Sequence, residues 1–180
     1  MDQPVELVPL VCIQCGTPVP AGPDEVAWVC AQCGQGMSLD EERGLLALEV
    51  NYSAGIAPHA SGKPFWVAEG LVTLQRESFG SSGKQAAEAQ KFWSKTHCFF
   101  IPAFHCSLET LLSLGSSLIL NPPDLQPGPS AQFEPATLYA EDVKAAAEFI
   151  IMAIEAGRKD KIKEIKFSLE LSALVLWILP

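Results

Sequence analysis

The 180-residue sequence predicts an α+β fold, with a small cysteine-bearing segment ahead of a mainly antiparallel sheet domain that carries one short and one long helix. Several stretches alternate apolar and polar residues with the two-residue period of strands, whereas one stretch repeats its apolar residues with the period of a helix. Two CxxC pairs near the N-terminus indicate a module that is stabilised by a metal ion.

Turn-forming residues divide the chain into three parts. Residues 1–51 hold both CxxC pairs and an exit strand, and residues 52–64 form a linker rich in Gly, Pro, Ser and Ala. Residues 65–180 form the α+β domain. Its proline-rich loop at 121–136 lies outside helices and sheet interiors, because proline lacks a backbone donor.

Strands are expected where β-branched and aromatic residues gather between turn signals. These stretches are residues 26–29, 45–51, 65–75, 98–104, 165–171 and 175–179. The stretch 165–171 has the clearest pattern, because four apolar residues alternate with Lys166, Ser168 and Glu170. We expect it to bury one face, and we expect 175–179 to be buried on both.

Two helices are expected. The short one begins after Ser107, which has the side chain of an N-cap, and ends at Gly115. The long one covers residues 140–156, where Val, Ala and Ile recur on one face. Glu148 and Glu155 on the long helix, and the mixed charges of residues 159–164 after it, are expected to lie in solvent.

Cys12, Cys15, Cys30 and Cys33 predict one tetrahedral metal site, which we assign to structural zinc. In each CxxC pair both sulfurs turn toward one point, and the glycine that follows permits the backbone to close the turn. The residues between the pairs are enough for a hairpin, which brings the pairs together across an ion about 2.3 Å from each sulfur. Four thiolates leave no open coordination position, so the site is not catalytic.

The segment from about residue 8 to residue 50 resembles the zinc-ribbon family, in which a hydrophobic strand leads into each CxxCG turn. That resemblance implies a structural zinc ion and the family's common association with transcription and replication. Two alternatives share the cysteines: a rubredoxin-like iron site for electron transfer, and two disulfides in an exported chain. The second CxxC lacks the proline of such iron sites, and the span between the pairs is short.

The charge of the chain bears on its partners. Twelve Lys and Arg against 21 Asp and Glu give a formal net charge of −9, and the first cation in the sequence is Arg43. The cysteine-bearing segment therefore has no cation for a phosphate, which argues against nucleic acid and anionic lipid as partners. Residues 159–166 are the remaining candidate for a basic patch.

Two further pairs, His97-Cys98 and His105-Cys106, stand eight residues apart. Along one strand that separation spans roughly 26 Å, so a shared ion would need a chain reversal between them. We favour packing in the core for these residues, with a second metal site as the alternative.

The sequence shows no constellation typical of an enzyme. Residues 80–84 have the composition of a flexible loop rather than a phosphate loop. Without a basic leader or an apolar run of about eighteen residues, a cytoplasmic location is expected. The apolar content of 48% favours a protein–protein adaptor or a small subunit of a larger assembly, with peripheral membrane association left open. A nucleic-acid-associated zinc-ribbon factor is the alternative, and a rubredoxin-like electron carrier the second alternative.

Overall fold

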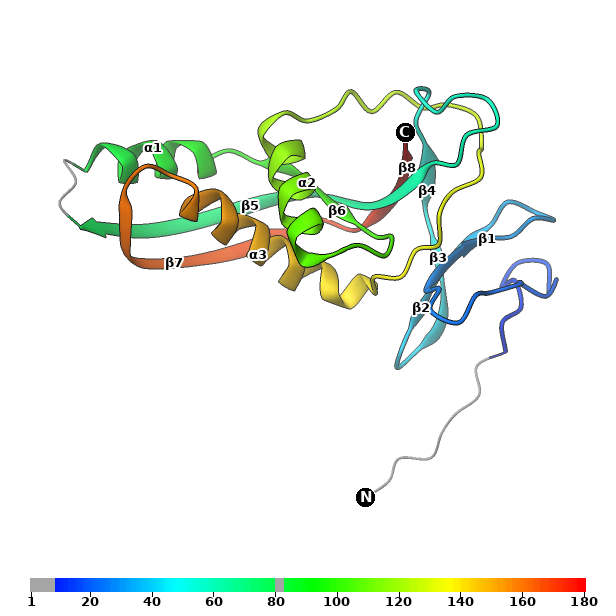
Figure 1. Cartoon of the computed structure of the whole chain (residues 1–180). Coiled ribbons are helices and arrows are strands. Elements are labelled where there is room, and N and C mark those ends of the chain that lie inside the picture. Colours follow the sequence, from blue (N-terminus) through cyan, green and yellow to red (C-terminus); the bar gives the residue numbers. More distant parts are fainter. Residues whose placement is uncertain (1–8, 80–82) are drawn as a thin grey trace, which may run out of the picture.

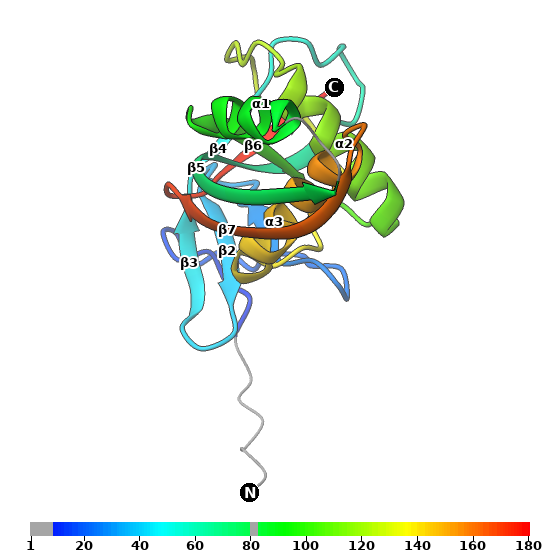
Figure 2. The same cartoon turned by 90° about the vertical axis from the view of Figure 1, so that its left-hand side faces the viewer.

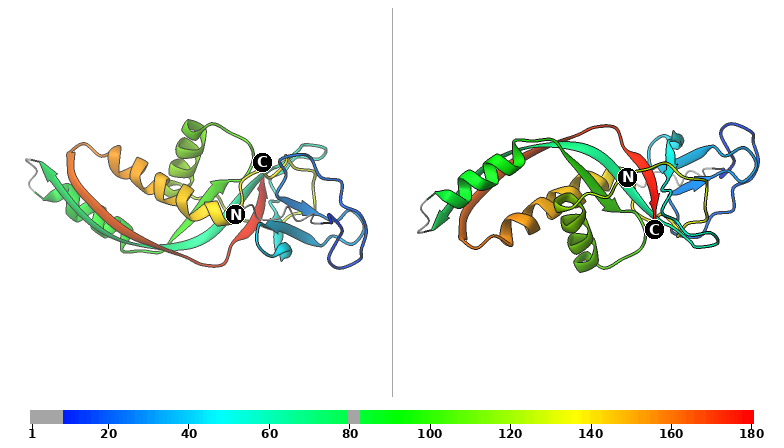
Figure 3. Two further views of the ribbon diagram at one scale, coloured as in Figure 1. Left: turned by 90° about the horizontal axis from the view of Figure 1, so that it is seen from below. Right: turned by 90° about the horizontal axis from the view of Figure 1, so that it is seen from above.

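The structure is a computed structural model that describes residues 9–79 and 83–180 (Figure 1). It confirms the α+β class, with a cysteine cluster near the N-terminus followed by a sheet domain. We call residues 9–48 the cysteine module. It lies at one end of the molecule, and the paired strands β5 and β7 extend toward the other end (Figure 3).

Strands form two sheets. The first is antiparallel, in the order β1 (Ala27–Val29), β2 (Gly36–Asp40) and β3 (Gly44–Leu48). The second has the order β4-β8-β5-β6, with β7 also paired to β5. Its strands are β4 (Val50–Tyr52), β5 (Lys63–Phe79), β6 (His97–Pro102), β7 (Lys161–Leu171) and β8 (Val175–Leu179). All pairings in the second sheet are antiparallel except that of β4 with β8.

The 17-residue strand β5 organises the second sheet. Its first half lies between β8 and β6, and its second half pairs with β7. β7 and β8 lie end to end along the same side of β5. Just after the end of β7, the Ser172 N–H still donates to the Glu69 carbonyl of β5, at 2.8 Å. The expected strand at 165–171 is therefore confirmed, and it begins four residues earlier, at Lys161.

Three α-helices accompany the second sheet: α1 (Lys84–Trp93), α2 (Leu108–Leu120) and α3 (Val143–Ala156), the last preceded by a 3-10 turn (Ala140–Asp142). Ser107 caps α2 as expected, since its side chain accepts from the Thr110 N–H at 3.2 Å. Helix α1 was not expected, although its Lys, Gln, Ala and Glu are strong helix formers. The glycine-containing loop before it lies partly outside the described residues, at 80–82.

The predicted end of the short helix at Gly115 is wrong, because α2 continues to Leu120. A Cβ atom on Gly115 would collide with Cδ1 of Ile150, a fully buried residue of α3. Glycine here serves the close approach of two helices rather than a helix terminus. The cost of about 1 kcal/mol for a glycine inside a helix is offset by this packing.

Glu155 was expected in solvent, and this prediction is wrong: its side chain is fully buried. Trp93 Nε1 donates to it at 2.7 Å, and Arg158 Nε donates to both of its oxygens at 2.8 and 2.9 Å. The Nε of Arg76 lies 3.1 Å from Glu155 Oε2, close enough for an ion pair, although its N–H is not aligned for a hydrogen bond. These partners from α1, β5 and the end of α3 compensate the cost of burying the carboxylate.

Asp160, in the segment that was expected to be exposed, belongs to the same buried network. Both of its oxygens accept from the Arg76 guanidinium, at 2.5 and 2.6 Å, and the Ser78 hydroxyl donates to one of them. These hydrogen bonds, the one from Arg76 first, hold the pKa of Asp160 below its ordinary value. Through Asp160, the run of mixed charges at 159–164 therefore joins β5 to the start of β7.

The segment between α2 and α3 joins the cysteine module to the second sheet. Ala136 forms bridges to Ala27 of β1 and to Phe104 beyond β6, and its carbonyl accepts from Val26 N–H at 2.8 Å. Within residues 52–64, Ser53 is buried and bridges to Pro127. The division of the chain into a metal-binding unit, a linker and a domain, at residues 1–51, 52–64 and 65–180, stays a prediction.

None of the helices in the described part of the chain is long and apolar enough to cross a bilayer.

Candidate metal centre

The two CxxC turns have the same local structure. In the first, the Gly16 N–H donates to the Cys12 carbonyl at 2.8 Å and the Cys12 N–H donates to the Thr17 carbonyl at 2.8 Å. In the second, the Gly34 N–H donates to the Cys30 carbonyl at 2.8 Å and the Cys30 N–H to the Gln35 carbonyl at 2.9 Å. The chain thus builds one kind of turn twice.

A glycine is required in each turn. Gly16 has a φ of 72° and Gly34 a φ of 75°, in the left-handed region that residues with a Cβ atom rarely adopt. The expectation that these glycines close the turns is confirmed.

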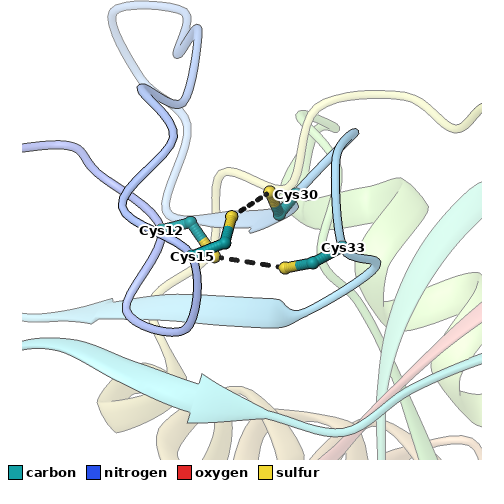
Figure 4. A group of neighbouring side chains, drawn as sticks. All are labelled: Cys12, Cys15, Cys30 and Cys33. Carbon is teal, nitrogen blue, oxygen red and sulfur yellow. Dashed lines mark hydrogen bonds between the residues drawn. The ribbon is translucent and has the colours of Figure 1, made fainter.

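The four sulfurs converge on one point, as Figure 4 shows. All lie within 4.8 Å of one another, with 3.5 Å from Cys12 Sγ to Cys33 Sγ and 3.6 Å from Cys15 Sγ to Cys30 Sγ. Four sulfurs about 2.3 Å from a central ion stand about 3.8 Å apart in a tetrahedron. The cluster therefore has the donor set and the size that a tetrahedral ion such as zinc requires.

The four thiols differ in exposure and in acidity. Cys12 and Cys30 are buried, whereas Cys15 and Cys33 face solvent. The Thr17 hydroxyl, 3.2 Å from Cys15 Sγ, lowers the pKa of Cys15 to about 6. For Cys33 the backbone of Gln35 acts in the same direction, but partial desolvation of its sulfur within the cluster and the three neighbouring cysteines outweigh it and raise the pKa to about 12. A cation at the centre would relieve this crowding of negative charge, because it binds the thiolate form.

A small apolar cluster supports the site from below. Buried Trp28 and Met37 pack with Val19 and with the two buried cysteines. Glu25 holds the hairpin between the CxxC pairs, because its carboxylate accepts from Trp28 Nε1 at 2.9 Å and from Gly22 N–H at 2.7 Å. Thr17 and Glu25 are contributors that the cysteine spacing alone did not identify, although a hydroxyl directly after a Cys-Gly turn is a usable signal.

The other His and Cys residues do not join a metal site. Within the described residues, the four cysteines of the module are the one set of three or more His, Cys or acidic side chains close enough to hold an ion. His97 stacks on Phe92 with ring centroids 4.3 Å apart, and His105 is exposed. Cys98 and Cys106 pack against the apolar cluster around Phe65, and burial raises the pKa of both thiols. The positions of His97, Cys98 and Cys106 agree with the packing interpretation, whereas that interpretation is wrong for the exposed His105.

No protein-family model, curated protein or solved structure matches this chain.

Proposed function

We propose that the chain is a non-catalytic zinc protein, in which a zinc ribbon holds one end of a protein–protein adaptor or of a small subunit in a larger cytoplasmic assembly. The observation that carries this proposal is the closed set of four convergent sulfurs, held by two identical turns. Four protein thiolates fill a tetrahedral coordination sphere, so the ion stabilises the fold and does not activate a substrate.

The choice of zinc rests on the chemistry of the donors. Four thiolates suit zinc and iron alike. The short span between the CxxC pairs and the absence of proline from the second pair favour zinc over a rubredoxin-like iron site.

The adaptor role is supported by the apolar surface on the helices. Large apolar side chains are exposed on α2, at Leu108 and Leu120, and on α3, at Phe149 and Met152. On α3 they form part of a stripe that faces away from the core, since exposed apolar residues recur at the helical spacing of Ala145, Phe149, Met152 and Ala156. A surface helix normally presents polar residues there, so this stripe is a candidate contact with another protein.

The metal assignment is tested by the metal content of the purified chain and by its response to a chelator. We expect about one zinc per chain, without the visible colour of an iron–thiolate centre, and loss of ordered structure in the cysteine module when zinc is removed. Iron in place of zinc, or a module that keeps its structure without metal, would overturn the zinc assignment.

The adaptor assignment is tested by purification from the native source. We expect a protein that copurifies at near-stoichiometric amounts with the unchanged chain and is lost from the double variant Phe149→Ser/Met152→Ser. Leu71→Ser removes an apolar side chain of β5 that is 45% exposed, close to the 48% of Met152, and serves as the matched control. Binding to DNA or RNA that weakens steeply with salt would instead support the nucleic-acid alternative.

A further inference from the structure

The outer edge of β7 is the longest unpaired strand edge that the described residues offer beside the core. β7 has 11 residues and pairs with β5 alone (Figures 1 and 2). An edge of this length exposes a row of backbone donors and acceptors to which another strand can pair.

The backbone groups on that edge can be assigned to particular residues. The Ser172 N–H donates toward β5, and the carbonyl of Pro64 on β5 accepts from the Ala103 N–H on the β6 side. In an antiparallel sheet the N–H and C=O groups of successive residues point alternately to the strand on one side and to the strand on the other. The register pairs Leu71 of β5 with Glu170, so the even-numbered residues of β7 between 166 and 170 direct these groups toward β5. The N–H and C=O groups of Ile165, Phe167, Leu169 and Leu171 therefore face away from β5.

The side chains on the core-facing side of β7 are incompletely covered. Leu169 is buried, whereas Ile165, Phe167 and Leu171 pack against the main core and remain half-exposed. Apolar side chains in this state gain free energy if a neighbouring strand extends the sheet over them.

We propose that β7 pairs in antiparallel fashion with β7 of a second copy of the chain, with the two-fold axis at Ser168. This register is chosen by the sequence of the strand. It places Phe167 opposite Leu169 and Ile165 opposite Leu171 on the core side, and Lys166 opposite Glu170 on the solvent side, each pair occurring twice by symmetry. An axis at Ile165 instead places Lys163 opposite Phe167 and Lys161 opposite Leu169, so charges would stand against apolar groups.

The charges on the solvent side agree with this arrangement. Lys166 has a weak, exposed partner within its own strand, Glu164 at 2.8 Å. Within residues 9–79 and 83–180, Glu170 takes part in no ion pair. The second copy supplies a cation to Glu170 and a further acid to Lys166. The pairing involves no residue of the cysteine module and does not depend on its metal.

The first experiment measures the mass of the zinc-loaded full chain by sedimentation velocity over a range of concentrations. We expect a species of twice the 19.4 kDa chain mass. Lys166→Glu or Glu170→Lys alone turns two attractive pairs into two repulsive ones, and each weakens dimerisation by about tenfold to thirtyfold. The double variant Lys166→Glu/Glu170→Lys restores both pairs and the dimer. Lys91→Glu on α1 is exposed and changes the net charge as Lys166→Glu does, and it leaves the dimer intact.

A second experiment tests the register without changing charge. Ser168→Cys places the same thiol from both copies opposite each other at the two-fold axis, at a non-hydrogen-bonded position where Cα atoms lie about 4.5 Å apart. We expect a disulfide-linked dimer with oxidised glutathione, and much less from Thr73→Cys, whose position lies opposite Ser168 on β5 within the chain.

A chain that stays monomeric at every concentration overturns the proposal. So does a dimer whose dissociation constant is unchanged by Lys166→Glu. If that dimer dissociates with Phe149→Ser/Met152→Ser instead, α3 is the interface. Circular dichroism of each variant establishes that the fold is retained.

Discussion

The cysteine module and the second sheet differ in how much apolar material they bury. The cluster inside the module has five buried residues, and two of them are the cysteines Cys12 and Cys30. The main core has nineteen, which come from all three α-helices, from most strands of the second sheet and from adjoining segments, with Ala27 of β1 as the one contribution from the module. A cluster of the smaller size does not offset the entropy of ordering some forty residues, so an ion held by the four sulfurs would add stabilisation that the module lacks and the sheet does not.

The two regions also treat buried polar groups differently. In the module the four thiol groups converge without a counter-charge from the protein, in the arrangement that could hold a metal ion. In the sheet domain Glu155 and Asp160 are compensated by the protein itself, through Arg76 and Arg158. The carboxylates of Glu155 and Asp160 thus have arginine partners, whereas charge on the four thiols would need a bound cation.

The largest effect is expected from Cys30→Ser. Loss of one buried thiolate leaves three ligands, so we expect the zinc content to fall from about one to near zero. The module then loses most of the stabilisation from metal binding, which is on the order of 10 kcal/mol for structural zinc. Hydrogen exchange checks the comparison directly: β1 and β2 should lose protection, while β5 and β8 keep theirs. Equal loss in both regions would show that they unfold as one unit.

Glu155→Ala should destabilise the sheet domain by about 3–5 kcal/mol, because Arg76 and Arg158 keep their charges and lose their shared partner. Urea denaturation gives the free energy of unfolding. Glu148→Ala on the same helix is the matched control, since Glu148 is half-exposed and forms no ion pair within the part of the chain that the structure describes. It should change stability by less than about 0.5 kcal/mol. Zinc content should be unaffected by either change.

The cysteine module and the sheet domain should respond to acid at different pH values. The pKa of Asp160 in the folded protein lies below its ordinary value. The free energy of folding that this carboxylate contributes is therefore complete above about pH 3.9, the pKa of an Asp side chain in the unfolded chain, and it is lost as the pH falls through the lower pKa of the folded state. Protons compete with zinc for the thiolates at higher pH, and we expect zinc release before the pH reaches about 4. A zinc-sensitive dye and the near-ultraviolet signal of the sheet domain follow the two events.

Asp160→Asn is the control for the acid titration. It removes the carboxylate that accepts from Arg76 and Ser78, so it should reduce the stability of the sheet domain at neutral pH by about 1.5–3 kcal/mol. It should also flatten the dependence of that stability on pH below about 4. Zinc release with acid should be the same as in the unchanged chain, and a shift in zinc release would mean that the two regions are coupled.

The smallest effect is expected from Gly115→Ala, at about 1–2 kcal/mol. The new methyl group meets Cδ1 of Ile150, and overpacking outweighs the gain in helix propensity. Thermal unfolding measures the change. Combining it with Ile150→Val removes the contacting atom and should restore part of the loss. A stabilising Gly115→Ala would show that α2 and α3 have room to separate.

Much of the local structure was predictable because it depends on near neighbours in the sequence. The strand at 175–179 follows from an unbroken apolar run, and the turns at Gly16 and Gly34 follow from the CxxCG pattern. The convergence of the four cysteines was predictable as well, since a hairpin of fixed length brings two identical turns together. Each of these features is decided within about twenty residues.

Other features depend on contacts that no local pattern contains. Gly115 is a residue type typical of helix ends, but it lies inside α2, where Ile150 of another helix packs closely against it. Glu155 is a residue type typical of protein surfaces, but Trp93, Arg76 and Arg158 surround its carboxylate. The sequence by itself determined the metal-ligand set and the class of fold, because these rest on spacing and periodicity. Only the tertiary structure decided which charges are buried and which strand edge is free, because both depend on residues that lie sixty or more positions apart.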